Sequence, residues 1–216
     1  MTKTIIFDFD ETLVNSRDVI IRLYNELADK YNFKKFKESD IPHFTGISIR
    51  ERCKLMNVPF HKLPLLVYEA HKNYRNYLHS VDIKSGIAEV LYKLKAYGFI
   101  LGIISSNATS NIKEFLHRNN LDIFKNIYSA RNLFGKHYAI NAFLKKNYLK
   151  KEDTLYIGDE VRDIISCKKS GVKIIAVTWG LDSIHLLQKE KPDFLANNPN
   201  EIIEIVNKFW QRNLIE

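Results

Sequence analysis

Short runs of β-branched and aromatic residues recur along the chain, separated by longer stretches in which apolar positions follow a helical period. The runs lack that period, are typical of buried strands, and cover residues 4–9, 99–104, 127–129, 154–157 and 173–178. The helical patterns cover residues 87–97, 109–119, 137–147, 161–170 and 200–210. Strands that alternate with helices pair in parallel through right-handed crossovers. The pattern therefore predicts an α/β fold, a three-layer, Rossmann-like parallel sheet.

The alternation stops between residues 15 and 81, where no run is convincing as a strand. Residues 18–31 form an amphipathic helical pattern, and further helical patterns interrupted by prolines follow it. We therefore predict an inserted all-helical subdomain at 15–81, with 1–14 and 82–216 forming the sheet domain.

The composition is that of an ordinary globular protein, which restricts the function classes. At roughly 150 residues per domain, the 216 residues correspond to one domain with a modest insertion, and 45% are hydrophobic. The densest apolar run, 99–104, is far shorter than the roughly 18 residues of a membrane helix, and Asp8 interrupts any signal-peptide pattern. We expect a cytoplasmic protein with no membrane partner.

Cys53 and Cys167 lack metal or redox spacing, so we expect incidental or buried thiols.

The net charge of +8 raises nucleic acid, membrane surfaces and small anions as partners. The basic residues are scattered in pairs beside helical patterns, which favours solvated helix faces over one binding strip. The chain carries no RNA-recognition, zinc-finger or helix-turn-helix signature, although the charge leaves a nucleic-acid partner open. The insertion holds 12 basic and 7 acidic residues, so much of the positive charge lies there.

Acidic and hydroxyl side chains follow three of the predicted strands. Open parallel sheets bind ligands beyond the carboxyl ends of their strands, where loops separate and helices begin. Strand alternation places Asp8 and Asp10 on one side of the backbone and turns Phe9 into the packing. The polar residues at the three ends are Asp8, Asp10 and Thr12; Ser105, Ser106 and Asn107; Asp159, Glu160 and Asp163.

These carboxylates would repel one another if the sheet brings them together. A divalent cation removes that repulsion, and oxygen ligands without nearby cysteine favour Mg²⁺. The sequence therefore predicts a magnesium site at this edge of the sheet.

The ordered set of strand ends resembles the haloacid dehalogenase (HAD) superfamily from Ile5 to about Asp193. DFDETL at residues 8–13 is similar to motif I of that family, Ser106-Asn107 to motif II, Lys136 in LFGK to motif III, and GDEVRD at residues 158–163 to motif IV. The helical insertion is similar to the C1 cap of subfamily I. The stretch from Tyr156 to Gly180 is most similar to phosphoglycolate phosphatase-like members.

The resemblance implies a role for each matching residue. Asp8 would attack phosphorus and Asp10 would act as acid and then base, while Lys136 would offset charge and orient the nucleophile. The implied Mg²⁺ ligands are Asp8, the Asp10 carbonyl, Asp159 and, in an outer position, Asp163. Phosphate binding is assigned to Ser106 and Asn107, and Thr12 is expected to position Asp10 at that phosphate site. The role of Glu160 stays open.

The acid two positions after the nucleophile separates reaction classes within the family. Dehalogenases and phosphonatases of the family typically lack it, whereas an alkoxide leaving group needs the proton that Asp10 can supply. The resemblance therefore implies an enzyme that hydrolyses phosphate monoesters with Mg²⁺ through an aspartyl phosphate. A phosphomutase and a nucleotide phosphatase of the same superfamily stay open, and a catalytically silent nucleic-acid or protein-binding module is the alternative from another class.

Substrate choice is expected to depend on the cap. Its segment 43–52 is where relatives with a C1 cap contact the leaving group, and Arg50 is the favoured anion contact, with Arg52 beside it. A positive cap over a neutralised pocket suits a small phosphorylated metabolite such as phosphoglycolate. The assembly is expected to be a monomer or a homodimer.

Overall fold

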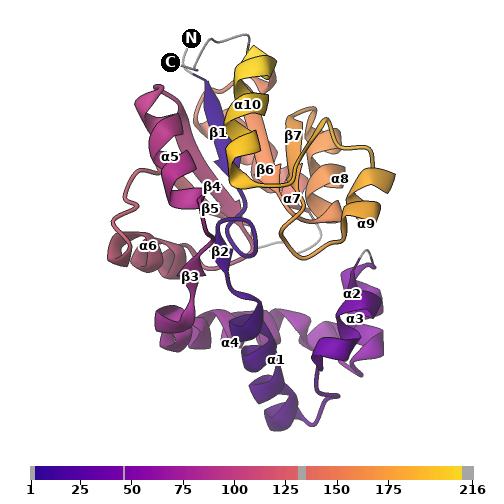
Figure 1. Cartoon of the computed structure of the whole chain (residues 1–216). Coiled ribbons are helices and arrows are strands. Elements are labelled where there is room, and N and C mark those ends of the chain that lie inside the picture. The colour runs from indigo at the N-terminus through magenta and orange to yellow at the C-terminus, as the bar shows by residue number, and fades with distance from the viewer. Residues whose placement is uncertain (1–2, 46, 131–134, 211–216) are drawn as a thin grey trace.

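The computed structural model describes residues 3–45, 47–130 and 135–210. Its centre is a six-stranded sheet in the order β5-β4-β1-β6-β7-β8, in which every neighbouring pair is parallel. The strands are β1 (Thr4–Phe7), β4 (Ile100–Ser105), β5 (Asn126–Ser129), β6 (Thr154–Gly158), β7 (Lys173–Val177) and β8 (Phe194–Ala196). Each connection between parallel neighbours carries a helix, so the prediction of an α/β fold is confirmed (Figure 1).

Helices cover both faces of the sheet and give it the predicted three layers. One face packs against α5 (Ile87–Ala96), α6 (Thr109–Arg118) and α10 (Pro199–Trp210). The other packs against α7 (Lys136–Lys146), α8 (Val161–Ser170) and α9 (Ile184–Lys189).

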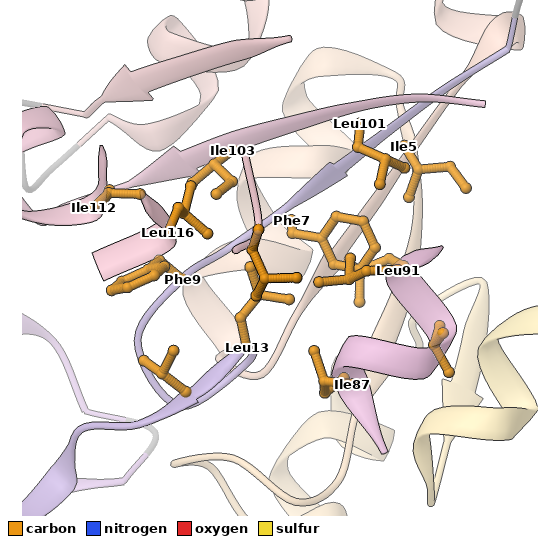
Figure 2. Packing of buried hydrophobic residues seen from close by; sticks show 14 of the residues in the cluster. Ile5, Phe7, Phe9, Leu13, Ile87, Leu91, Leu101, Ile103, Ile112 and Leu116 are labelled. Atoms are coloured by element: carbon orange, nitrogen blue, oxygen red, sulfur yellow. The ribbon is translucent and has the colours of Figure 1, made fainter. Parts of the chain in front are cut away.

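Alternation along β1 feeds both hydrophobic layers. Ile5 and Phe7 enter the first layer, and Ile6 enters the second, each fully buried. Figure 2 shows residues of β1, β4, α5 and α6 converging in the first layer. Phe9 follows them into it, with its ring centroid 5.4 Å from that of Phe115. This packing leaves Asp8 and Asp10 directed away from the core.

A helical segment lies beyond the carboxyl ends of the strands (Figure 1). It contains α1 (Arg17–Tyr31), α2 (Ile41–Phe44), α3 (Ile49–Leu55) and α4 (Leu63–Tyr74), with short 3-10 turns at Glu38–Asp40, Phe60–Lys62 and Arg75–Ser80. The segment has its own small hydrophobic cluster, to which Leu27, Cys53 and Leu66 belong. Two short strands, β2 (Val14–Asn15) and β3 (Asp82–Ile83), pair antiparallel where the chain enters and leaves the segment.

Several details differ from the sequence-based prediction, including the short helix α9, which was not predicted. β1 ends at Phe7 because the chain turns there: Phe9 enters the core and Asp10 bridges to Val14. The strand β8 and the β2–β3 ribbon were missed, since two or three residues are too few to show a period.

Cys53 and Cys167 are buried free thiols, as expected. Within the described part of the chain, no helix has the length and apolar character needed to cross a bilayer.

Candidate active site

The sheet order brings the predicted polar strand ends together. β1 lies between β4 and β6, so Asp8 follows the central strand while Ser106 and Asp159 follow its two neighbours. Parallel pairing aligns these ends at one edge of the sheet. The segment containing α1 to α4 lies over the same edge (Figure 1).

Three carboxylates form a compact cluster at this edge. One oxygen each from Asp8, Asp159 and Asp163 lies within 4.8 Å of the others, and all three side chains are buried. The pKa of Asp159 is raised well above its usual value, mainly by burial and to a lesser extent by the negative charges of Glu160 and Asp8. A set of hard oxygen donors that repel one another is the chemistry that a divalent cation neutralises, so the three residues could hold a metal ion.

Lys136 lies inside the cluster at the start of α7. Its Nζ is 2.9 Å from Asp8 Oδ2 and 2.6 Å from Asp163 Oδ1. Burial alone would lower the pKa of Lys136, but Asp163 and Asp8 raise it above its ordinary value. The lysine is therefore charged, and it fixes one oxygen of Asp8 while leaving Oδ1 to accept from the Phe9 N–H at 2.8 Å.

Two short hydrogen bonds orient Asp159. Its Oδ1 accepts from the Thr12 hydroxyl at 2.6 Å and its Oδ2 from the Leu181 N–H at 2.7 Å. Gly180 makes this approach possible, because a Cβ there would lie 2.1 Å from the Cβ of Asp159. The structure thus places Thr12 on Asp159 instead of Asp10, because the turn after Asp10 carries its side chain towards β6.

Asp10 is held by residues from two different segments. Its Oδ1 accepts from the Tyr74 hydroxyl at 2.9 Å, and Asn107 Nδ2 lies 3.2 Å from its Oδ2. Desolvation raises the pKa of Asp10, although hydrogen bonds, including those from Tyr74 and Asn107, act in the opposite direction. A raised pKa favours the protonated carboxyl that a general acid needs.

The end of β4 distinguishes the two serines that follow one another there. Ser105 is fully buried, and its Oγ accepts from the Asn107 N–H at 3.1 Å. Ser106 is only partly buried, so it is the more accessible of the two serines. The Asn107 N–H donates to Ser105 in this structure, so it would bind a phosphoryl oxygen only in exchange for that hydrogen bond.

A second group of charged residues adjoins Asp159. Glu160 pairs with Arg162 at 2.5 Å, and Arg52 of α3 approaches it at 3.8 Å. Burial opposes the ionisation of Glu160, but Arg162 and then Arg52 lower its pKa. Arg50 instead is exposed and lies over the Phe60 ring, 5.0 Å from its centroid. The structure thus brings Arg52, and not Arg50, to the site.

A family model of haloacid dehalogenase-like hydrolases matches residues 5–177, which is most of the chain and includes all of these strand ends. The chain belongs to the haloacid dehalogenase-like hydrolase family. The resemblance drawn from the sequence motifs is therefore confirmed, as is the prediction that the chain is a hydrolase.

Several relatives of this HAD hydrolase align over nearly their whole length. A phosphoglycolate phosphatase of Synechococcus elongatus is 26% identical over 97% of this chain and 100% of its own. The pyrophosphatase PpaX of Bacillus mycoides is 23% identical over 95% of this chain and 97% of its own. A crystal structure described as a predicted phosphatase from Clostridium acetobutylicum has a TM-score of 0.82, with 23% identity, covering 96% of this chain and 100% of that one. That likeness shows the shared fold.

Three site residues of this HAD hydrolase were missed from sequence or given less weight. Tyr74 ends a helical pattern and its ring does belong to the core, so nothing marked its hydroxyl. Arg162 resembled any helix-surface arginine, and Arg52 was placed second to Arg50. The described residues do not include Gly46 of the predicted specificity segment, nor Leu133 and Phe134 of motif III.

The acidic cluster gives the metal-free HAD hydrolase a defined pH dependence. Burial raises the pKa of Asp163 to about 6, although the charge of Lys136 acts in the opposite direction. An aspartate in the unfolded chain has a pKa of about 3.9. The folded state therefore binds this proton more tightly than the unfolded state. The contribution of Asp163 to the free energy of unfolding is expected to fall as the pH rises from about 4 to about 6.

This expectation is checked with chelator-treated protein. The thermal midpoint of Asp163→Asn is subtracted from that of the wild type across the same pH window, which cancels the groups that titrate alike in both proteins. The difference is expected to decrease with rising pH. A difference that increases would contradict the raised pKa and show that pairing with Lys136 outweighs burial.

Proposed function

We propose that this hydrolase is a Mg²⁺-dependent phosphatase that cleaves small phosphate monoesters through a phosphorylated Asp8. The observation that carries the proposal is the buried cluster of Asp8, Asp159 and Asp163 within 4.8 Å, with Lys136 paired to Asp8 and Asp163. Such a cluster has the donor set of a magnesium site and an oriented carboxylate in one place.

The proposed reaction divides hydrolysis into two displacements. In the first, an oxygen of Asp8 bonds to phosphorus as the bond to the leaving oxygen breaks, and Asp10 gives that oxygen its proton. In the second, Asp10 takes a proton from water, the water oxygen bonds to phosphorus, and the bond to Asp8 breaks. Asp10 thus returns to its protonated state at the end of each cycle.

The other residues bind and orient the phosphoryl group. Lys136, paired with Asp8, would keep the nucleophile in place and offset the charge of the incoming phosphate. Ser106, with Asn107, would hold phosphoryl oxygens, and Thr12 supports the site through Asp159. Bound Mg²⁺ would neutralise charge on the transferring group, held by Asp8, Asp159, the Asp10 carbonyl and, close behind them, Asp163.

Residues 15–81 are proposed as the cap, with boundaries at the β2–β3 ribbon. The named substrates of the two relatives, phosphoglycolate and pyrophosphate, share a second anionic group beside the phosphate that is cleaved. Arg52 is the residue of the proposed cap that approaches the site, and its Nε is buried with no hydrogen-bond partner among the described residues. We therefore assign the second anionic group of the substrate to Arg52.

A phosphate-release assay with Mg²⁺ tests this function on phosphoglycolate, pyrophosphate, nucleoside monophosphates and sugar phosphates. Arg52→Gln is expected to raise KM about tenfold for the preferred substrate with a second anionic group, because one charge-assisted hydrogen bond is lost. The same change is expected to alter KM for 4-nitrophenyl phosphate, whose leaving group is uncharged, by about twofold or less.

Two further variants sharpen the assay. Arg22→Gln is the matched control, since Arg22 is an exposed arginine of the same segment that pairs with Glu26 at 3.4 Å. Arg50→Gln tests the sequence-based choice, and we expect a KM close to that of the wild type. A rise in KM for Arg50→Gln together with no change for Arg52→Gln would move the anion contact to Arg50.

A further inference from the structure

The hydroxyl group of Tyr74 joins the helical segment to Asp10. Tyr74 is the last residue of α4, and its hydroxyl lies 2.9 Å from Asp10 Oδ1. The tyrosine is 3% exposed and belongs to the hydrophobic layer that contains Phe9. Leu66, earlier in α4, belongs instead to the small cluster of the helical segment. The helix is therefore anchored in both parts, and its end reaches the acid.

A second connection runs from α4 to the same carboxylate. The His71 carbonyl accepts from Asn111 Nδ2 at 2.8 Å, and that nitrogen lies 3.1 Å from Asn107 Oδ1. Asn107 Nδ2 in turn lies 3.2 Å from Asp10 Oδ2. The end of α4 thus contacts Asp10 directly through Tyr74 and indirectly through two asparagines.

These contacts distinguish the two oxygens of Asp10. A tyrosine hydroxyl is protonated at neutral pH, so it donates to the oxygen that it contacts, and that oxygen has little freedom to carry a proton of its own. The proton of a protonated Asp10 is therefore directed to Oδ2. Asn107 Nδ2 is shared between the two oxygens, at 3.2 Å from Oδ2 and 3.4 Å from Oδ1. Both contacts are longer than that of Tyr74, so Asn107 competes weakly with a substrate oxygen at Oδ2.

We propose that Tyr74 is a positioning residue, which holds Asp10 so that Oδ2 carries the proton delivered to the leaving oxygen. The inference rests on the proposed role of Asp10 as acid and base. Tyr74 transfers no proton itself: the proton moves from Asp10 Oδ2 to the leaving oxygen as the bond from that oxygen to phosphorus breaks and the Asp8 bond forms. Proton delivery then depends on the docking of α4 against the core.

The test is Tyr74→Phe, which keeps the buried ring and removes only the hydroxyl. The readout is kcat/KM for two esters of similar size, phenyl phosphate and 4-nitrophenyl phosphate, since this ratio reports the step in which the leaving group departs. Phenolate needs protonation far more than 4-nitrophenolate does. We expect about a tenfold loss for phenyl phosphate and about a twofold loss or less for 4-nitrophenyl phosphate.

The matched control is Tyr77→Phe, because the Tyr77 hydroxyl bonds Glu26 at 2.5 Å within the helical segment and not Asp10. It is expected to leave both ratios unchanged. An equal loss on both esters in Tyr74→Phe, or no loss on either, would overturn the positioning role while leaving the proposed function intact. A wild type that releases no phosphate from either ester would overturn the proposed function, and the inference with it. Thermal midpoints of both variants confirm that they are folded.

Discussion

Replacing Asp8 with asparagine is expected to lower kcat for phosphate release by at least about 10⁴-fold, because the amide cannot form the acyl phosphate. The fold should survive the change. Lys136 keeps its contact with Asp163 at 2.6 Å, and removing one carboxylate relieves repulsion among the remaining acids. The thermal midpoint of Asp8→Asn without metal is therefore expected to equal or exceed that of the wild type.

The comparison needs an aspartate that lies away from the site. Asp122 serves, since it is exposed and its carboxylate lies 2.9 Å from His117 Nδ1 on the surface. Asp122→Asn is expected to retain wild-type turnover. Turnover by folded Asp8→Asn at the wild-type rate would remove Asp8 as nucleophile and require a mechanism in which water attacks phosphorus directly.

Removing divalent cations is expected to stop turnover, and added Mg²⁺ is expected to restore it. Without a cation, Asp159 and Asp163 keep raised pKa values because burial and neighbouring acids disfavour their charge. Mg²⁺ at about 100 times its dissociation constant would stabilise the folded state by about 2.7 kcal/mol, which raises the thermal midpoint by about 5 to 10 °C.

Asp159→Asn tests whether both effects come from a cation bound in this cluster. The variant keeps a side chain of the same size next to Thr12, but it loses a ligand charge, so we expect both the rescue and the thermal shift to weaken strongly. Glu190→Gln, at a partly exposed position directly after α9, is the control. Equal turnover and an equal thermal midpoint before and after chelation of the wild type would contradict a metal in this cluster.

The part of the site that the sequence predicted is the part that strand topology determines. Buried strands with flanking helices admit few arrangements, and in a parallel sheet the ends of neighbouring strands meet at one edge. The proximity of Asp8 and Asp159 follows from that rule alone. Lys136 begins a helix outside the strands, so it was identified only through the resemblance to the HAD family.

The remaining contacts depend on how distant segments meet. Tyr74 bonds a residue 64 positions earlier in the sequence, and Arg52 approaches one 108 positions later, so no local period or motif marks either contact. Thr12 was expected on Asp10, its close neighbour, but the turn in the chain carries its hydroxyl to Asp159 on another strand. The sequence favoured Arg50 over Arg52, and no local pattern showed that Arg50 lies over the Phe60 ring.

The most direct test of the account is to capture the phosphorylated residue. Asp10→Asn lacks the base for the second displacement, so with Mg²⁺ and 4-nitrophenyl phosphate it is expected to accumulate phosphate on Asp8. Borohydride reduces an acyl phosphate to an alcohol, and mass spectrometry of the digested protein is then expected to find homoserine at position 8. Homoserine at another position, or an unmodified Asp8 in a variant that has released a burst of 4-nitrophenol, would contradict the central claim.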